Sequence, residues 1–129
     1  MMKFHDITVG SAKLKAKIAK KTRDQALGLM FIKDMASDQG MLFTYPQPQR
    51  LSFWMKNTTI PLSIAFIDEN YKIFQIEDLI PGNEESVKSN SPGIGALEVN
   101  QGWFKQNNIK IGDKISLKSN KIIKIKVIK

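Results

Sequence analysis

Residues 13–20 read KLKAKIAK, in which lysines alternate with apolar side chains from Lys13 to Ile18. Successive side chains of a β-strand point to opposite faces, so this period of two predicts a half-buried strand with Leu14, Ala16 and Ile18 facing inward. Residues 4–9 precede a glycine and a serine, and they predict the partner strand of a hairpin. The chain is therefore expected to begin with β-structure.

Short apolar or aromatic runs separated by turn-forming residues predict further strands along the chain. These strands are expected over residues 41–45, 51–56, 62–68, 71–76, 96–99, 114–117 and 122–128. No internal repeat or linker interrupts them. About eight short strands with one or two short helices predict a single mostly-β domain over residues 1–129, folded as a sandwich or a distorted barrel.

A helix is predicted at one point between these strands. Thr22 and Gln25 have the spacing of a capping box, so a short helix is expected from Thr22 to Phe31. Residues 102–107 predict a second helical turn. Residues 46–49, which contain two prolines, are expected to break the strand before them, and residues 81–95 to form a surface loop.

The net charge of +8 is concentrated at the two ends of the chain. Residues 1–21 carry +5 and residues 110–129 carry +6, whereas residues 22–109 carry −3. Lysines that alternate along strands discourage edge-to-edge pairing and attract polyanions weakly. Both tryptophans and both arginines lie outside these lysine-rich segments, so specific nucleic-acid recognition is not predicted.

The chain of 129 residues has no cysteine and one histidine, His5. Disulfides, thiolate catalysis, iron–sulfur clusters and cysteine-based zinc sites are thereby excluded, and no cofactor or metal is predicted. No apolar run approaches the roughly 20 residues of a membrane span, and the first residues lack the apolar core of a signal peptide. A complete chain would be cytoplasmic; a mature exported form expressed from an added methionine is the alternative.

Residues 50–62, RLSFWMKNTTIPL, form the stretch richest in candidate binding groups. In one interpretation, Trp54, Lys56 and Asn57 form the rim of a pocket, where an aromatic surface, a cation and an amide orient a ligand. In the other, Trp54 packs in the core, Lys56 is a solvated edge charge and Asn57 forms a turn. Large side chains lie on both faces of the strand predicted over residues 51–56, which suggests that both of its faces are covered by other parts of the protein.

Arg23 and Arg50 stand out because lysine supplies nearly every other cation. A guanidinium group binds carboxylates or phosphates bidentately, which a lysine cannot do. Glu98 lies in the apolar run ALEV and is the candidate internal partner of one arginine. Alternatively, an arginine left without such a partner binds a ligand anion.

Several short motifs together resemble one protein family. The stretches GLMF (28–31), GMLF (40–43), FWMKNT (53–58) and LE (97–98) are similar to blocks of the bacterial and archaeal family called domain of unknown function 192. The resemblance covers about residues 5–118. Ser63 stands where that family usually has aspartate, and the turn at Asn70-Tyr71 lacks the usual glycine.

The resemblance implies a compact β-rich domain with no established activity. Many members are exported or membrane-anchored in bacteria, which favours a mature exported form. It also favours a shared site that contains Arg23, Trp54, Lys56 and Asn57.

From the sequence we expect a monomeric, non-catalytic binding domain whose pocket is lined by Arg23, Trp54, Lys56, Asn57 and Glu98. The expected ligand is a small polar or anionic molecule, or a sugar that stacks on Trp54. One alternative is a hydrolase that uses carboxylates or a metal held by them. Another is an interaction module that holds anionic polymers on its lysine-rich strands.

Overall fold

The computed structural model describes residues 2–117, and the strand predicted over residues 122–128 lies outside this range. The elements are β1 (Phe4–Val9), β2 (Ala12–Ala19), α1 (Thr22–Leu27), β3 (Gln39–Gln49), β4 (Ser52–Phe53), β5 (Leu62–Ile67), β6 (Ile73–Leu79), β7 (Val87–Lys88), β8 (Gly93–Asn100), α2 (Trp103–Gln106) and β9 (Ile115–Leu117). Neither helix in this part of the chain is long and apolar enough to cross a membrane.

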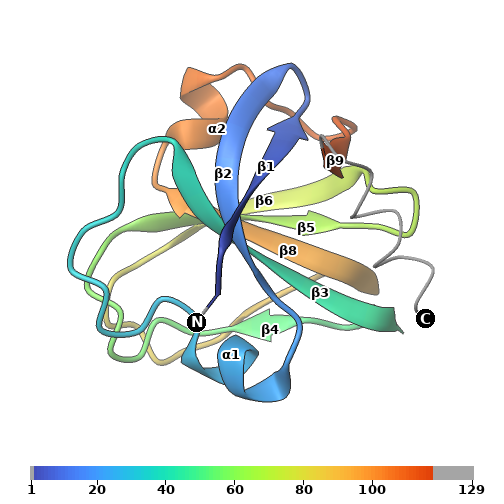
Figure 1. Cartoon of the computed structure of the whole chain (residues 1–129). Coiled ribbons are helices and arrows are strands. Elements are labelled where there is room, and N and C mark those ends of the chain that lie inside the picture. Colours follow the sequence, from blue (N-terminus) through green and yellow to red (C-terminus); the bar gives the residue numbers. More distant parts are fainter. Residues whose placement is uncertain (1, 118–129) are drawn as a thin grey trace.

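Seven strands form one curled sheet in the order β6-β5-β8-β3-β2-β1-β9, and β4 pairs with β7 in a second, small sheet (Figure 1). Adjacent strands are antiparallel except for β2 and β3, which are parallel. The first and last strands of this order approach each other, because Lys72 and Lys114 form a bridge and the Ile73 amide donates to the Asp113 carbonyl at 2.9 Å. The predicted mostly-β fold is confirmed, in its barrel-like form.

Apolar side chains fill both faces of the curled sheet. On β3 and β8, Leu42 and Leu97 belong to one core cluster, whereas Met41, Phe43 and Ala96 belong to the other. This alternation follows from the two-residue period of a strand. The helices α1 and α2 lie at opposite ends of the sheet (Figure 1). The core on the side of α1 is the one that leads to the candidate site.

The predicted capping box at the start of α1 is wrong. Lys21 occupies the N-cap position with no side-chain cap, and the helix ends at Leu27 rather than Phe31. The Gln25 side chain instead donates to the carbonyls of Ala19 and Thr44, at 3.1 and 2.8 Å. Satisfying two strand carbonyls replaces the local hydrogen bond that the spacing predicted.

Three predictions about strand boundaries are also corrected. β3 continues through the prolines of residues 46–49, and its pairing with β8 shifts register between Thr44 and Gln49, where proline lacks the amide needed for a regular ladder. The predicted loop over residues 81–95 contains β7 and the buried beginning of β8. The predicted strand 51–56 is reduced to β4, and Ser52, Trp54 and Lys56 are exposed, so one of its faces is not covered.

Candidate binding pocket

A pocket of about 300 Å³ lies between α1, the turn that follows it, and strands β3, β4 and β8. It is lined by Thr22, Gln25, Ala26, Leu27, Gly28, Leu29, Met30, Phe43, Tyr45, Ser52, Phe53, Trp54, Met55, Thr58 and Glu98. Apolar and aromatic groups predominate, and a few hydroxyl, amide and carboxyl groups stand among them. This mixture is typical of small-molecule sites.

Glu98 is the buried acid of this pocket, with 4% of its surface exposed. Met41 on β3 and Ile64 on β5 are its direct cross-strand partners, so its side chain leaves the sheet between two apolar neighbours. No residue within 2–117 forms a hydrogen bond or ion pair with its carboxyl group. Burial away from water disfavours the charged form and raises the pKa of Glu98 from 4.5 to about 8. At neutral pH the carboxyl group is therefore mainly protonated and can donate a hydrogen bond.

Tyr45 is the second titratable group of the pocket. Burial and, to a lesser degree, the neighbouring Glu98 carboxyl group together raise the pKa of its phenol to about 12. The Tyr45 hydroxyl consequently stays protonated across the physiological range. The pocket thus presents two hydroxyl-type donors near each other and no fixed negative charge at neutral pH.

Aromatic rings form the outer wall of the pocket. Phe53 packs edge-on against Phe43, with ring centroids 4.8 Å apart. Trp54 lines the pocket with 43% of its surface exposed, and the Lys56 ammonium lies 5.3 Å from its ring centroid. This cation–π contact restrains the indole at the pocket mouth.

The helix that covers the pocket is held by local contacts. The two hydrogen bonds of Gln25 attach α1 to β2 and β3. Gly28 follows the helix with φ +51° and ψ −130°, a conformation that glycine adopts without steric cost because it has no Cβ. Its missing side chain faces Phe43, which a Cβ would approach at 3.7 Å. The chain can thus turn immediately after Leu27 and place Leu29 and Met30 in the pocket wall.

The structure brings together two of the five residues expected in the site. Trp54 and Glu98 line the pocket, and Lys56 contacts it only through Trp54. Asn57 is not part of the lining; it has φ 56° in a turn, and its carbonyl accepts a hydrogen bond from the Phe31 amide at 2.9 Å. Arg23 lies on the other side of α1, in a separate hollow.

The predicted internal arginine–Glu98 pair is wrong for the described residues. Glu98 has no ion pair within residues 2–117, and Arg50 donates instead to the Asn90 carbonyl at 3.3 Å. Neither arginine lines the pocket beside Glu98. Sequence reasoning assumed that a buried acid needs a cation, whereas here burial keeps the acid neutral.

Residues that sequence reasoning missed include Gln25, Phe43, Tyr45 and Thr58. A signal for some of them was present, because each of the four motif stretches, 28–31, 40–43, 53–58 and 97–98, contributes at least one side chain to the lining. Nothing in the sequence marked Tyr45. Within residues 2–117, no group of three histidine, aspartate or glutamate side chains is placed to hold a metal ion.

Comparison with known proteins identifies the family. The model of DUF192, a family described as "Uncharacterized ACR", matches residues 5–117. The chain belongs to the DUF192 family. This match confirms the resemblance inferred from the motifs, over nearly the same residues.

Two solved structures resemble this DUF192 protein throughout. A candidate transcription regulator from Sinorhizobium meliloti 1021 is 30% identical, with a TM-score of 0.86 over 90% of this chain and 95% of that one. A protein of unknown function from Novosphingobium aromaticivorans DSM 12444 is also 30% identical, with a TM-score of 0.83 over 88% of this chain and 84% of that one. No curated protein matches the sequence significantly.

Ser63, the position at which the family resemblance implied an aspartate, lies outside the pocket. Its hydroxyl is 2.9 Å from an Asp78 carboxylate oxygen and accepts a hydrogen bond from the Gly102 amide at 3.2 Å. It is buried on the sheet face opposite Ile64 and Glu98. In this chain the position joins β5, β6 and the segment before α2.

Proposed function

We propose that this DUF192 protein is a non-catalytic binding domain whose pocket takes a small, uncharged, hydroxyl-bearing ring molecule such as a monosaccharide. The observation that carries the proposal is the Glu98 carboxyl group, which lies in the pocket wall and forms no hydrogen bond or ion pair with residues 2–117. A buried polar group without a partner is costly. A ligand oxygen that accepts its proton would remove this cost.

The remainder of the lining supports the same class of ligand. Sugars combine ring hydroxyls with an apolar face, and the pocket combines Tyr45, Thr22 and Ser52 with the rings of Phe53 and Trp54. No lysine or arginine of residues 2–117 lines the pocket, which supports an uncharged ligand over the anionic one that the sequence also allowed. A volume of about 300 Å³ lies at the small end of the range for ligand sites.

Saturation-transfer NMR and tryptophan fluorescence test this function with N-acetylglucosamine, glucose and the anionic control glucuronate. We expect the neutral sugars to bind and glucuronate to bind less well. Trp54→Ala and Glu98→Leu should each weaken binding by about tenfold or more, whereas Glu98→Gln, which keeps a donor, should stay within a few-fold. Arg50→Gln, outside the pocket, is the matched control.

Two results would reject the proposal. One is that no neutral sugar binds at millimolar concentration while the protein is folded. The other is that Arg50→Gln weakens binding as much as Trp54→Ala does.

The hydrolase alternative has less support. Glycoside-type hydrolysis uses two carboxyl groups that face each other across the substrate, and Glu98 is the one acid among the described residues that line the pocket. The Sinorhizobium meliloti neighbour is described as a candidate transcription regulator, so a role in transcription is a further alternative for this chain.

A further inference from the structure

A second hollow, of about 650 Å³, lies between the N-terminal segment, β1, β2 and α1. Its charged lining comprises Lys3, Lys17, Lys20, Lys21, Arg23 and Asp24, with His5 at its side. The helix α1 separates it from the first pocket, and Leu27 lines both. The cations that line this one hollow therefore come from the N-terminal segment, from β2, from the connection after β2, and from α1.

The positive charge of this hollow is not neutralised within the described structure. Five cationic groups face one acid, and no carboxylate of residues 2–117 forms an ion pair with any of the five. Several like charges around one concavity create a positive potential, which a multivalent anion would relieve. Arg23 adds a planar fork suited to two oxygens of one phosphate or carboxylate group.

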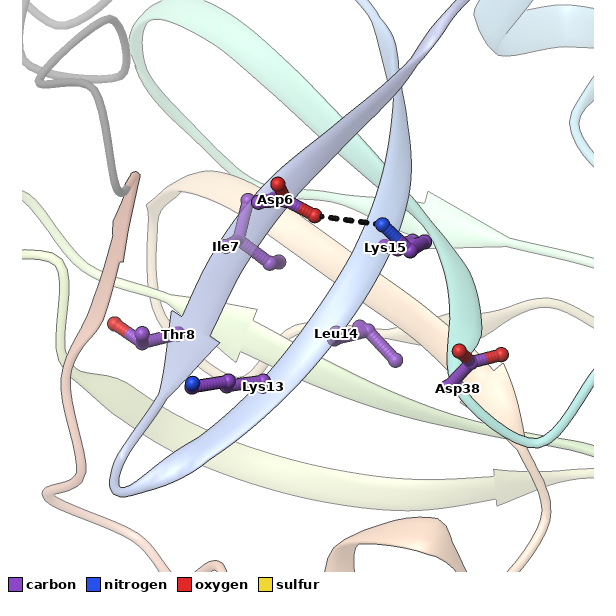
Figure 2. A pocket seen from close by; sticks show the side chains of 7 residues that line it. All are labelled: Asp6, Ile7, Thr8, Lys13, Leu14, Lys15 and Asp38. Carbon is purple, nitrogen blue, oxygen red and sulfur yellow. Dashed lines mark hydrogen bonds and ion pairs between the residues drawn. The ribbon is translucent and has the colours of Figure 1, made fainter.

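The neighbouring hollow on the same hairpin provides a comparison (Figure 2). Its volume is about 280 Å³, and its charged lining is balanced, with Lys13 and Lys15 against Asp6 and Asp38. Lys15 and Asp6 are joined by an ion pair of 3.0 Å, drawn in Figure 2. The excess of positive charge is thus a property of the α1 hollow and not of the whole lysine-rich hairpin.

We propose that the α1 hollow binds a compact, soluble anion that carries two or more phosphate or carboxylate groups. Its volume is that of a small-molecule site. A linear polyanion contacts many successive basic groups, and the basic surface beside the α1 hollow is interrupted by Asp6 on β1 and by Asp38, which directly precedes β3. The proposal stands apart from the neutral-ligand pocket, since the two linings share only Leu27.

Isothermal titration calorimetry at low salt tests the proposal with inorganic tripolyphosphate and citrate. Orthophosphate, which has a single phosphate group, is the reference. We expect the multivalent anions to bind better than orthophosphate, and added salt to weaken them. The triple variant Lys20→Gln/Lys21→Gln/Arg23→Gln should lose affinity by about tenfold or more. The control Lys13→Gln/Lys15→Gln, from the balanced hollow, should change it less than about twofold.

All five substituted side chains are exposed, so circular dichroism should show both variants folded. An equal loss in the two variants would overturn the proposal in favour of diffuse attraction. So would binding of double-stranded DNA or of anionic lipid vesicles with no response to tripolyphosphate or citrate. If only tripolyphosphate or only citrate binds, the result supports the site and identifies phosphate or carboxylate, respectively, as the group that it recognises.

Discussion

Glu98 carries its carboxyl group on the pocket face of β8, between Met41 and Ile64. The sequence marked this residue because it is the acid in an apolar run, and that signal was correct for burial. It could not identify the neighbours, which come from β3 and β5, more than 30 residues away in the chain. The same limit explains the wrong arginine partner. Burial could be predicted from the local pattern, whereas the environment that sets the pKa depends on strand order.

The buried Glu98 predicts how stability depends on pH. Its pKa is about 8 in the folded protein and near 4.5 when unfolded, so the unfolded chain releases the proton first as pH rises. The free energy of unfolding should therefore decrease between these two pH values, by about 3 to 5 kcal/mol from this group. Denaturant unfolding across this pH range measures the slope, which Glu98→Gln should remove. If the free energy of unfolding changes with pH equally in the wild type and in Glu98→Gln, the prediction is contradicted.

Asn57 allows a test that separates a turn from a binding role. Asn57 has φ 56°, a backbone conformation that alanine adopts less readily than asparagine or glycine. Asn57→Ala should therefore lower the free energy of unfolding by about 1 kcal/mol, whereas Asn57→Gly should be close to neutral. Thermal unfolding measures both. Sugar binding should persist in each folded variant, because Asn57 does not line the pocket. Loss of binding in a stable Asn57→Gly protein would instead place this side chain on the ligand.

At the level of elements, alternation predicted the strands well where one face is buried, as in β2, whose Leu14 and Ala16 are buried. The alternation pattern failed where pairing with a neighbouring strand determines how far a strand extends. β3 passes through Pro46 and Pro48 because a register shift accommodates them, and β8 begins at Gly93, inside a segment that looked like a loop. Polar composition and prolines are local signals, and pairing across the sheet overrides them.

Close strand packing beside the pocket predicts a sensitive glycine. A Cβ on Gly40 would lie 2.6 Å from the Glu98 carbonyl oxygen and 3.2 Å from side chains of Leu14 and Val99. Gly40→Ala should therefore push β3 and β8 apart and cost about 2 to 3 kcal/mol in denaturant unfolding. The control Gly82→Ala meets no atom within 4 Å and should lose only about 1 kcal/mol through its φ of +76°. Equal costs would refute the steric explanation.

Ser63 allows a test of what an aspartate, which the family resemblance implied at this position, would do in this chain. Ser63 and Asp78 are direct cross-strand partners, so Ser63→Asp would place two carboxylates side by side. We expect a loss of about 1 to 2 kcal/mol at neutral pH, smaller at acidic pH where one carboxyl is protonated. Adding Asp78→Asn should restore most of this stability. If the loss is independent of pH and is not rescued, size rather than charge is responsible.

For the molecule as a whole, the net charge of +8 is the sum of basic chain ends and a slightly acidic middle segment. Every residue that lines the first pocket comes from the slightly acidic middle of the chain, residues 22–109. The basic N-terminal segment was expected to serve solubility and edge protection, but the fold gathers part of it around one hollow with Arg23. That convergence was not predictable, because it depends on α1 folding back beside β1 and β2.

The placement of two hollows on either side of α1 leads to a prediction about the whole protein. Since their linings share only Leu27, occupation of one should leave the other unchanged. With N-acetylglucosamine and tripolyphosphate together, the two gains in unfolding free energy should add within about 0.5 kcal/mol. The Lys20→Gln/Lys21→Gln/Arg23→Gln variant should keep its sugar affinity, and Trp54→Ala its tripolyphosphate affinity. If instead either variant loses both ligands, or one ligand changes the affinity of the other, the two hollows act as one site that spans α1. The natural ligand would then have to carry a neutral ring and an anionic group in the same molecule.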